Sequence, residues 1–316
     1  MQIYTGPLGG LGECPILTRM ALLNSTRSLL SPAALDSLNT MFLAWLSPRS
    51  KVVWASSENS WLWTDGSENL DATRKGCVYL TALALNTSHP STKLELDGRT
   101  VAEHVAAWET HWRNYFLHRA VEGIGVEMGS PTYGKYSLQN FVNIADLSPN
   151  LADLAGNFLQ LWFADAAQAF LPSSGVRGGA HNRVYRGPTF FSGQSDGFRG
   201  FSWLYGWWQS PDKRTEDLAI GVPQMTLLAT SSWQPRPIIT AMATDTTSLT
   251  EPFMYVSRRM GDTLPCTQAL GPVDHQGTKS ANGTCTKIPC KPCRVCRGVL
   301  AWSACDTLVV PTTVRG

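Results

Sequence analysis

Apolar residues at helical spacing, in segments joined by short connections, most limit what this chain can fold into. In the segment 100–123, Val101, Val105, Trp108, Trp112 and Phe116 follow one another three or four residues apart, which is the period of one helix face. Its first residues, Thr100 and Glu103, have the spacing of a capping box. No stretch alternates apolar and polar residues as a half-buried strand would, and no exact internal repeat occurs. The pattern therefore predicts an all-α protein.

Five further helices are predicted from the same pattern. The segment 31–47 opens with Ser31 as a cap and Pro32 at the first helical position, a favoured start. The others are predicted over 67–86, from about 131 to 147, from Ser148-Pro149 to 171, and over 215–232 with an interruption at Pro223. Successive helices with short loops favour stacked hairpins, and a ring of hairpins would form an (α/α) toroid.

Two segments break the helical pattern. The segment 175–209 is rich in glycine, arginine and aromatic residues, so it is interpreted as long loops, which are usually functional or mobile in a compact domain. Beyond residue 261, six of the eight cysteines gather in a region with little apolar periodicity. We therefore predict a toroid domain over 1–260 and a Cys-rich tail over 261–316, which is either disordered or the product of a faulty gene model.

The cysteines of the tail include the run "CKPCRVC" at 290–296. Zinc ribbons use two separated CxxC pairs, whereas this run compresses three cysteines and has no histidine beside it. Zinc binding and disulfide formation both remain open for it, and no metal site or cofactor is predicted.

Composition excludes some classes of function. The 316 residues carry 26 Lys and Arg against 24 Asp and Glu without a basic block, which argues against nucleic-acid binding. Apolar runs such as 78–85 are too short to span a bilayer, so no membrane association is predicted. No signal peptide is visible, yet glycosylation triplets occur at Asn24, Asn86 and Asn282. The compartment stays open, with secretion or a lumenal location suspected, and the sequence does not predict the oligomeric state.

The stretch "VEMGSPTYGKYSLQN" at 126–140 is the first candidate site. If a helix begins at about residue 131, Tyr133, Tyr136, Asn140 and Asn143 fall along one stripe, opposite an apolar face. This arrangement suits a wet cleft with Glu127 at its rim. The alternative is a pair of tyrosines that pack through their rings and satisfy their hydroxyls locally.

The second candidate is "WLWTDGSENLDATRK" at 61–75. Asp65, Glu68, Asn69 and Asp71 gather at a helix start, where helix capping explains some of them. Trp61 and Trp63 stand directly alongside. The chain's 12 Trp, 8 Tyr and 11 Phe fit either a bulky helical core or a cleft whose aromatic faces stack on sugar rings.

The third candidate is "VRGGAHNRVYRG" at 176–187. It combines Arg177, His181, Arg183, Tyr185 and Arg186 with glycines that let the backbone approach a ligand. Arginine forks grip carboxylates, although a surface loop with solvated arginines is the simpler interpretation.

Three histidines are spaced seven apart within 100–123. Because His104, His111 and His118 would lie roughly 10 Å apart along a helix, they are too distant to share one metal ion. We interpret them as a partly exposed stripe.

The segments "GSENLDATRKGCVYL", "VEMGSPTYGKYSLQNFVNIADL", "LWFADAAQ" and "GVRGGAHNRVYRG" together cover roughly residues 54–208. In them the chain resembles a largely uncharacterised family of helical-toroid proteins related to heparinase- and alginate-lyase-type polysaccharide enzymes. The resemblance implies an (α/α) toroid with a central cleft, commonly followed by a β-sandwich. It also implies that Asn69 and Arg183 bind a uronate carboxylate while Tyr133, Tyr136 and Tyr185 are the candidates for proton transfer. Further substrate contacts are predicted at Arg177, His181, Asn140, Trp61 and Trp63.

The chain departs from that family in two places. Leu70 stands where similar sequences carry a histidine after the asparagine, and the Cys-rich tail stands where a β-sandwich would follow. The first expected function is a polysaccharide lyase that cleaves a uronic-acid-containing polymer by β-elimination. Two alternatives remain, a glycoside hydrolase that uses Glu127 with Glu68 or Asp71, and a catalytically degenerate carbohydrate-binding relative, which Leu70 and the tail favour.

Overall fold

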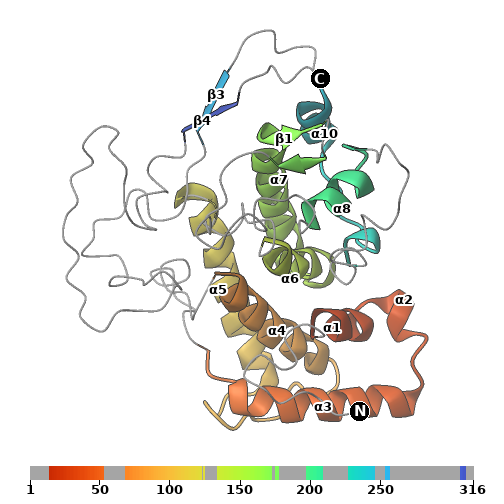
Figure 1. Cartoon of the computed structure of the whole chain (residues 1–316). Coiled ribbons are helices and arrows are strands. Elements are labelled where there is room, and N and C mark those ends of the chain that lie inside the picture. The colour runs from red at the N-terminus through yellow and green to blue at the C-terminus, as the bar shows by residue number, and fades with distance from the viewer. Residues whose placement is uncertain are drawn as a thin grey trace, which may run out of the picture.

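The computed structural model of the chain is mainly helical, as Figure 1 shows. It describes residues 14–52, 68–122, 124, 134–172, 175–177, 197–208, 227–245, 253–256 and 307–310. The helices are α1 (Cys14–Leu22), α2 (Asn24–Arg27), α3 (Pro32–Leu46), the short 3-10 helix η1 (Ser47–Arg49), α4 (Glu68–Asn86), α5 (Val101–Glu122), α6 (Gly134–Leu147), α7 (Ala152–Gln168), α8 (Gly197–Leu204) and α10 (Pro237–Thr244). The strands are β1 (Phe170–Leu171), β2 (Val176–Arg177), β3 (Phe253–Val256) and β4 (Thr307–Val310). The all-α class is confirmed at this level.

Two helix starts follow the predicted capping chemistry. The Ser31 hydroxyl accepts a hydrogen bond from the Ala34 amide at 3.2 Å, and α3 then begins with Pro32. At α5, the Thr100 amide donates to the Glu103 carboxylate at 2.8 Å, while the Glu103 amide donates back to the Thr100 hydroxyl at 3.2 Å. These reciprocal bonds satisfy amides that would otherwise lack partners in the first turn of the helix.

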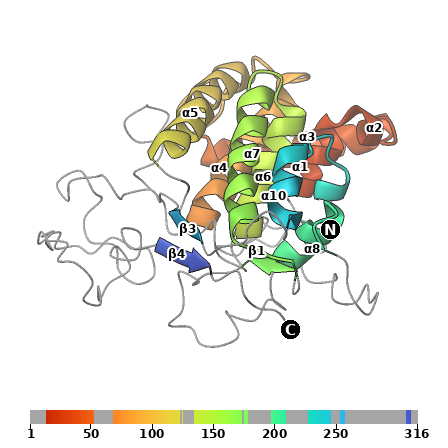
Figure 2. The same cartoon turned by 90° about the horizontal axis from the view of Figure 1, so that it is seen from above.

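Helices α4 to α7 form the body of the molecule and alternate in direction along the chain. Helix α5 runs antiparallel to α4, because Arg119 meets Glu68 at one end and Glu109 lies by Tyr79 further along. Helix α6 runs in the same direction as α4, since Thr73 contacts residue 136 and Gly76 faces Asn140. Helix α7 folds back along α6 after a short turn. Seen from above, the α6–α7 pair lies between α5 on one side and α1 and α10 on the other (Figure 2).

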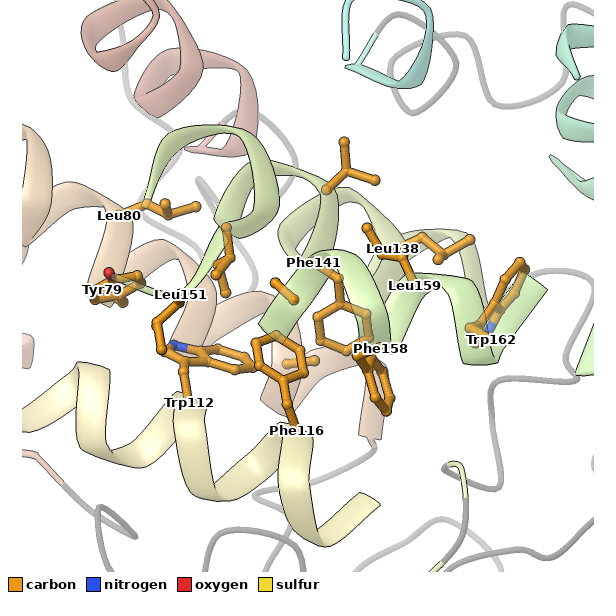
Figure 3. Close-up of a cluster of buried hydrophobic side chains, with 14 of the residues drawn as sticks. Tyr79, Leu80, Trp112, Phe116, Leu138, Phe141, Leu151, Phe158, Leu159 and Trp162 are labelled. Carbon is orange, nitrogen blue, oxygen red and sulfur yellow. The ribbon is translucent and has the colours of Figure 1, made fainter. Parts of the chain in front are cut away.

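Aromatic side chains fill the core where these helices meet. Trp112 and Phe116 of α5 point toward Phe141 of α6 and Phe158 of α7 (Figure 3). The rings of Phe116, Phe141 and Phe158 lie with centroids 5.2 to 5.6 Å apart. Burying one such side chain stabilises the fold by about 1.5–3 kcal/mol. Much of the chain's aromatic content therefore serves a helical core.

The predicted start of the fifth helix at Ser148 is wrong. Helix α7 begins at Ala152 and ends at Gln168, and Phe170 and Leu171 belong to β1. The Ser148 hydroxyl bonds to the Tyr79 hydroxyl at 2.6 Å, and Leu151 is buried in the core. These contacts place residues 148–151 in a turn between two helices.

The segment 175–209, predicted as loops, contains a helix. Helix α8 buries Phe201, and the Ser202 hydroxyl donates to the Gly175 carbonyl at 3.1 Å. These tertiary contacts outweigh the low helix propensity of the glycines. Just before it in the chain, β1 pairs antiparallel with β2, Phe170 opposite Arg177.

The second strand pair joins parts of the chain that are far apart in sequence. Strand β3 pairs antiparallel with β4, with Phe253 opposite Val310 and Val256 opposite Thr307. Strand β4 thus lies within the segment 261–316 that the sequence assigns to the tail. Most of that tail, like most of the predicted helix 215–232, lies outside the described residues.

The prediction of a partly exposed histidine stripe on α5 is wrong for two of its three residues. His104 and His111 are fully buried, and the half-buried His118 is the third. His104 accepts a hydrogen bond from the Trp108 indole at 3.0 Å, and His111 packs edge-on against the rings of Trp108 and Trp112. The prediction failed because α5 is enclosed by the α4, α6 and α7 helices and by its own aromatic residues.

Among the described helices, none is both long enough and apolar enough to cross a bilayer.

Candidate functional site

One end of the helical body carries the described parts of the segments that the sequence singles out. The start of α4, the end of α5, the start of α6 and the end of α7 share this end, as the helix directions require. The segment 61–75 leads into α4, the segment 126–140 leads into α6, and the segment 176–187 begins at β2, whose partner β1 follows α7. We call this end the polar end.

Buried charges distinguish the polar end from the aromatic core. Six charged residues at this end each have an exposed fraction of 9% or less: Glu68, Asp71, Lys75, Arg119, Lys135 and Asp165. Charged groups are seldom buried to this extent without partners, because removing an ion from water costs several kcal/mol. A helical bundle that needed only stability would place apolar side chains here.

Arg119 and Glu68 form an ion pair between α5 and α4 at the polar end. The Arg119 Nη1 atom lies 3.2 Å from Glu68 Oε1, and the guanidinium lies over the ring of Tyr115 at 4.4 Å. The Arg119 Nε atom is buried and has no hydrogen-bond acceptor within the described residues. The pair therefore fixes the first turn of α4, including the neighbouring Asn69, against the last turn of α5.

A second ion pair stands one turn further along α4. Lys75 Nζ lies 2.8 Å from Asp71 Oδ2, at the i,i+4 spacing of one helix face. Burial lowers the pKa of Lys75, although the Asp71 carboxylate opposes this effect. Asp71 is thus engaged within its own helix.

The stripe on α6 does not face a wet cleft, so that prediction is wrong for its two amides. Asn140 and Asn143 are fully buried. A Cβ atom placed on Gly76 would lie 2.7 Å from the Asn140 side chain, and Asn143 donates to the Pro15 carbonyl at 2.8 Å. The reason is that α4 and α1 pack over the polar face of α6, which helical periodicity alone would leave exposed to solvent.

Tyr136 differs from these amides because it is only half-buried. Its backbone carbonyl accepts a hydrogen bond from the Thr73 hydroxyl at 3.2 Å, and the Lys135 ammonium lies 5.5 Å from its ring centroid. Of the three tyrosines predicted for proton transfer, Tyr136 is the one whose surroundings the structure describes. It lies in the first turn of α6, at the polar end.

The described residues bring Glu68, Asn69, Asp71 and Tyr136 together at the polar end, with Asn140 enclosed one turn deeper. The backbone of Arg177 lies in β2. The remaining predicted residues lie outside the described residues and stay predictions: Trp61, Trp63, Glu127, Tyr133, His181, Arg183 and Tyr185.

Sequence reasoning missed Arg119, Lys75 and Lys135. A signal for Arg119 is present, because it continues the stripe of Trp112 and Phe116 on α5. A charged residue in an apolar stripe indicates a buried partner, and this one is Glu68.

Among the described residues, no three histidine, cysteine, aspartate or glutamate side chains come together as a potential metal site. Nor do similar proteins supply an identity, because comparisons with protein-family models, with curated proteins and with solved structures found no match for this chain.

Proposed function

We propose that this chain is a polysaccharide lyase that cleaves a uronic-acid-containing polymer by β-elimination at the polar end. The observation that carries the proposal is that the described parts of the candidate segments 61–75 and 126–140 meet at one end of the helical body, beside a group of buried charged side chains. Buried charge in an otherwise aromatic core has a cost in stability, and such costs concentrate at functional sites.

The proposed chemistry assigns a role to each residue type. Asn69 and Arg183 hold the uronate carboxylate, and neutralising its charge makes the adjacent C5 proton more acidic. One tyrosine among Tyr133, Tyr136 and Tyr185 removes that proton as a base. A double bond forms between C4 and C5 as the C4–O bond breaks, and a second tyrosine protonates the leaving oxygen. Arg177 and His181 make further substrate contacts.

The proposed architecture is the (α/α) toroid. The antiparallel pairs α4–α5 and α6–α7 are consistent with two successive hairpins of such a ring. In this arrangement the polar end would be the mouth of the central cleft.

Hydrolysis is less well supported, because it needs two carboxyl groups with separate acid and base or nucleophile roles. Glu68 is bound to Arg119, and Asp71 is bound to Lys75. Both carboxylates are thus engaged in ion pairs, Glu68 with α5 and Asp71 within α4. Glu127, the remaining candidate, lies outside the described residues.

Elimination and hydrolysis are distinguished by one paired assay on a panel of uronate-containing polysaccharides. Ultraviolet absorbance reports the unsaturated product of elimination, and a reducing-end assay on the same sample reports every cleavage. We expect both signals to rise together. Reducing ends without absorbance would contradict elimination and transfer the function to hydrolysis.

The variants that test the site are Asn69→Ala and Tyr136→Phe. We expect Asn69→Ala to lower turnover at least tenfold, because the carboxylate loses a donor. The control is Tyr79→Phe, which also removes a phenol hydroxyl but lies about 16 Å along α4 from Glu68. Tyr79→Phe should lower stability, because its hydroxyl bonds to Ser148, and leave turnover unchanged. Full activity in Asn69→Ala would contradict its assignment.

Carbohydrate binding without catalysis is the second candidate, and Leu70 favours it. This half-buried residue follows Asn69 in the first turn of α4, where a histidine base is expected by resemblance. A folded wild-type protein that binds uronate polymers without cleaving them would establish this reading. Leu70→His would then be expected to produce measurable elimination.

A further inference from the structure

We propose that Cys14 and Cys77 form a disulfide bond that fastens the first described helix to the helical body. Both are free and buried, and they lie on helices α1 and α4, which pack against each other. This site is independent of the polar end and of the function proposed for it.

Contacts place the two thiols on facing surfaces. Cys14 Sγ lies 3.9 Å from the hydroxyl of Thr81, which is one helical turn beyond Cys77 on α4. The Cys14 side chain also contributes to the raised pKa of Cys77, as expected for two thiols that lie near each other. Two neighbouring thiols on packed helices can approach to the short separation that a disulfide requires.

The reaction needs a disulfide oxidant, for which oxidised glutathione serves. Cys14 is 7% exposed and Cys77 is fully buried, so the oxidant reaches Cys14 first. The Cys14 thiolate attacks the glutathione disulfide and releases one glutathione. The Cys77 thiolate then attacks the Cys14 sulfur and releases the second. In total, two thiols lose two protons and two electrons, and one glutathione disulfide becomes two thiols.

Burial controls the rate of this exchange. Burial raises the pKa of the Cys77 thiol, and the neighbouring Cys14 side chain adds to the effect. Because the thiolate is the reactive form, exchange in the folded chain is slow near neutral pH. The bond therefore forms most readily during folding, before α1 covers α4.

The bond would constrain the whole body of the molecule. It closes a loop of roughly 60 residues, and the stabilisation from a crosslink grows with loop length. Helix α1 also holds α6, because Arg19 binds Asn143 and Asp146. We expect the oxidised chain to melt roughly 5 to 10 °C above the reduced chain.

The test uses the full chain, reduced and then equilibrated in a series of glutathione buffers of rising oxidising strength. One arm starts from folded protein, and the other refolds from urea in the same buffers. After acid quenching and alkylation of free thiols, mass spectrometry of proteolytic peptides identifies each pairing. We expect a Cys14–Cys77 crosslinked peptide in the refolding arm, with the rise in melting temperature that accompanies it.

Cys14→Ser and Cys77→Ser are the matched controls. Each variant should abolish the crosslinked peptide. Each should also abolish the dependence of melting temperature on the ratio of oxidised to reduced glutathione, even where the six cysteines of the tail form disulfides of their own. Complete alkylation of both cysteines in both arms would overturn the proposal. So would pairing of Cys14 with a cysteine of the tail in the wild type.

Discussion

At the scale of single residues, the histidine at position 104 links folding stability to pH. Burial lowers the pKa of His104 to about 4, whereas its ordinary value is 6.5. Between these values the unfolded chain binds a proton that the folded chain does not. The neutral His104 therefore costs no unfolding free energy above about pH 6.5, and the unfolding free energy falls as the pH drops toward 4. A tenfold difference in proton affinity corresponds to about 1.4 kcal/mol, so the loss is at most about 3.5 kcal/mol.

Urea unfolding over this pH range measures the effect. His104→Gln keeps an acceptor for the Trp108 indole but cannot titrate, so it should flatten the slope of unfolding free energy against pH. His118→Gln, which replaces the half-buried histidine on the same helix, should leave the slope in place. An unchanged slope in His104→Gln would refute the assignment.

The ion pair between Arg119 and Glu68 makes a second prediction at this scale. Arg119→Met removes the buried cation and leaves the Glu68 carboxylate, at 8% exposure, without it. We expect a loss of about 3–5 kcal/mol in unfolding free energy. The double variant Arg119→Met with Glu68→Met removes both charges and should be much closer to the wild type. If the double variant lost as much as the two single variants together, the two residues would be energetically independent.

At the scale of elements, the close approach of α4 and α6 depends on a residue without a side chain. A Cβ atom on Gly76 would lie 2.7 Å from both Cβ and Oδ1 of Asn140, closer than real contacts allow. Gly76→Ala should therefore force the helices apart and lower the unfolding free energy by about 1–3 kcal/mol.

Gly156 of α7 provides the matched control for this variant. A Cβ there would meet the Trp233 ring at 3.4 Å, an ordinary contact. Gly156→Ala should then stabilise the protein by up to about 1 kcal/mol through helix propensity. Thermal unfolding of the two variants checks the opposite signs. Equal effects would mean that the α4–α6 contact adapts to the added methyl group.

Some features of these helices could be predicted from the sequence, and others could not. Periodicity and capping predicted α3, α4 and α5 closely, because both signals are local to the helix. They missed α8 and the burial of His104, Asn140 and Asn143, because these depend on which helices pack together. For the same reason the sequence singled out Glu68 as a candidate but not its ion-pair partner Arg119, which is 51 residues away.

At the scale of the whole molecule, Arg19 joins three distant parts of the chain. Its guanidinium donates to Asn143 Oδ1 at 3.1 Å and to Asp146 Oδ2 at 2.8 Å on α6. It also donates to the carbonyl and hydroxyl oxygens of Thr230, at 2.6 and 3.1 Å. The same Asp146 accepts from the amide and hydroxyl of Ser232. One buried side chain thus holds α1 and residues 227–232 against the α6–α7 pair.

Because Arg19 makes these hydrogen bonds with all three nitrogens of its planar guanidinium, a lysine cannot reproduce them. Arg19→Lys should lower the unfolding free energy by about 3 kcal/mol, nearly as much as Arg19→Met. Arg27, whose guanidinium donates to the Ala21 carbonyl at 3.0 Å, is the control, and Arg27→Met should cost less than about 1 kcal/mol. Hydrogen exchange should accelerate together in α1 and in residues 227–232 of the Arg19 variants. Acceleration confined to α1 would mean that the two segments are held independently, and that Arg19 serves only its own helix.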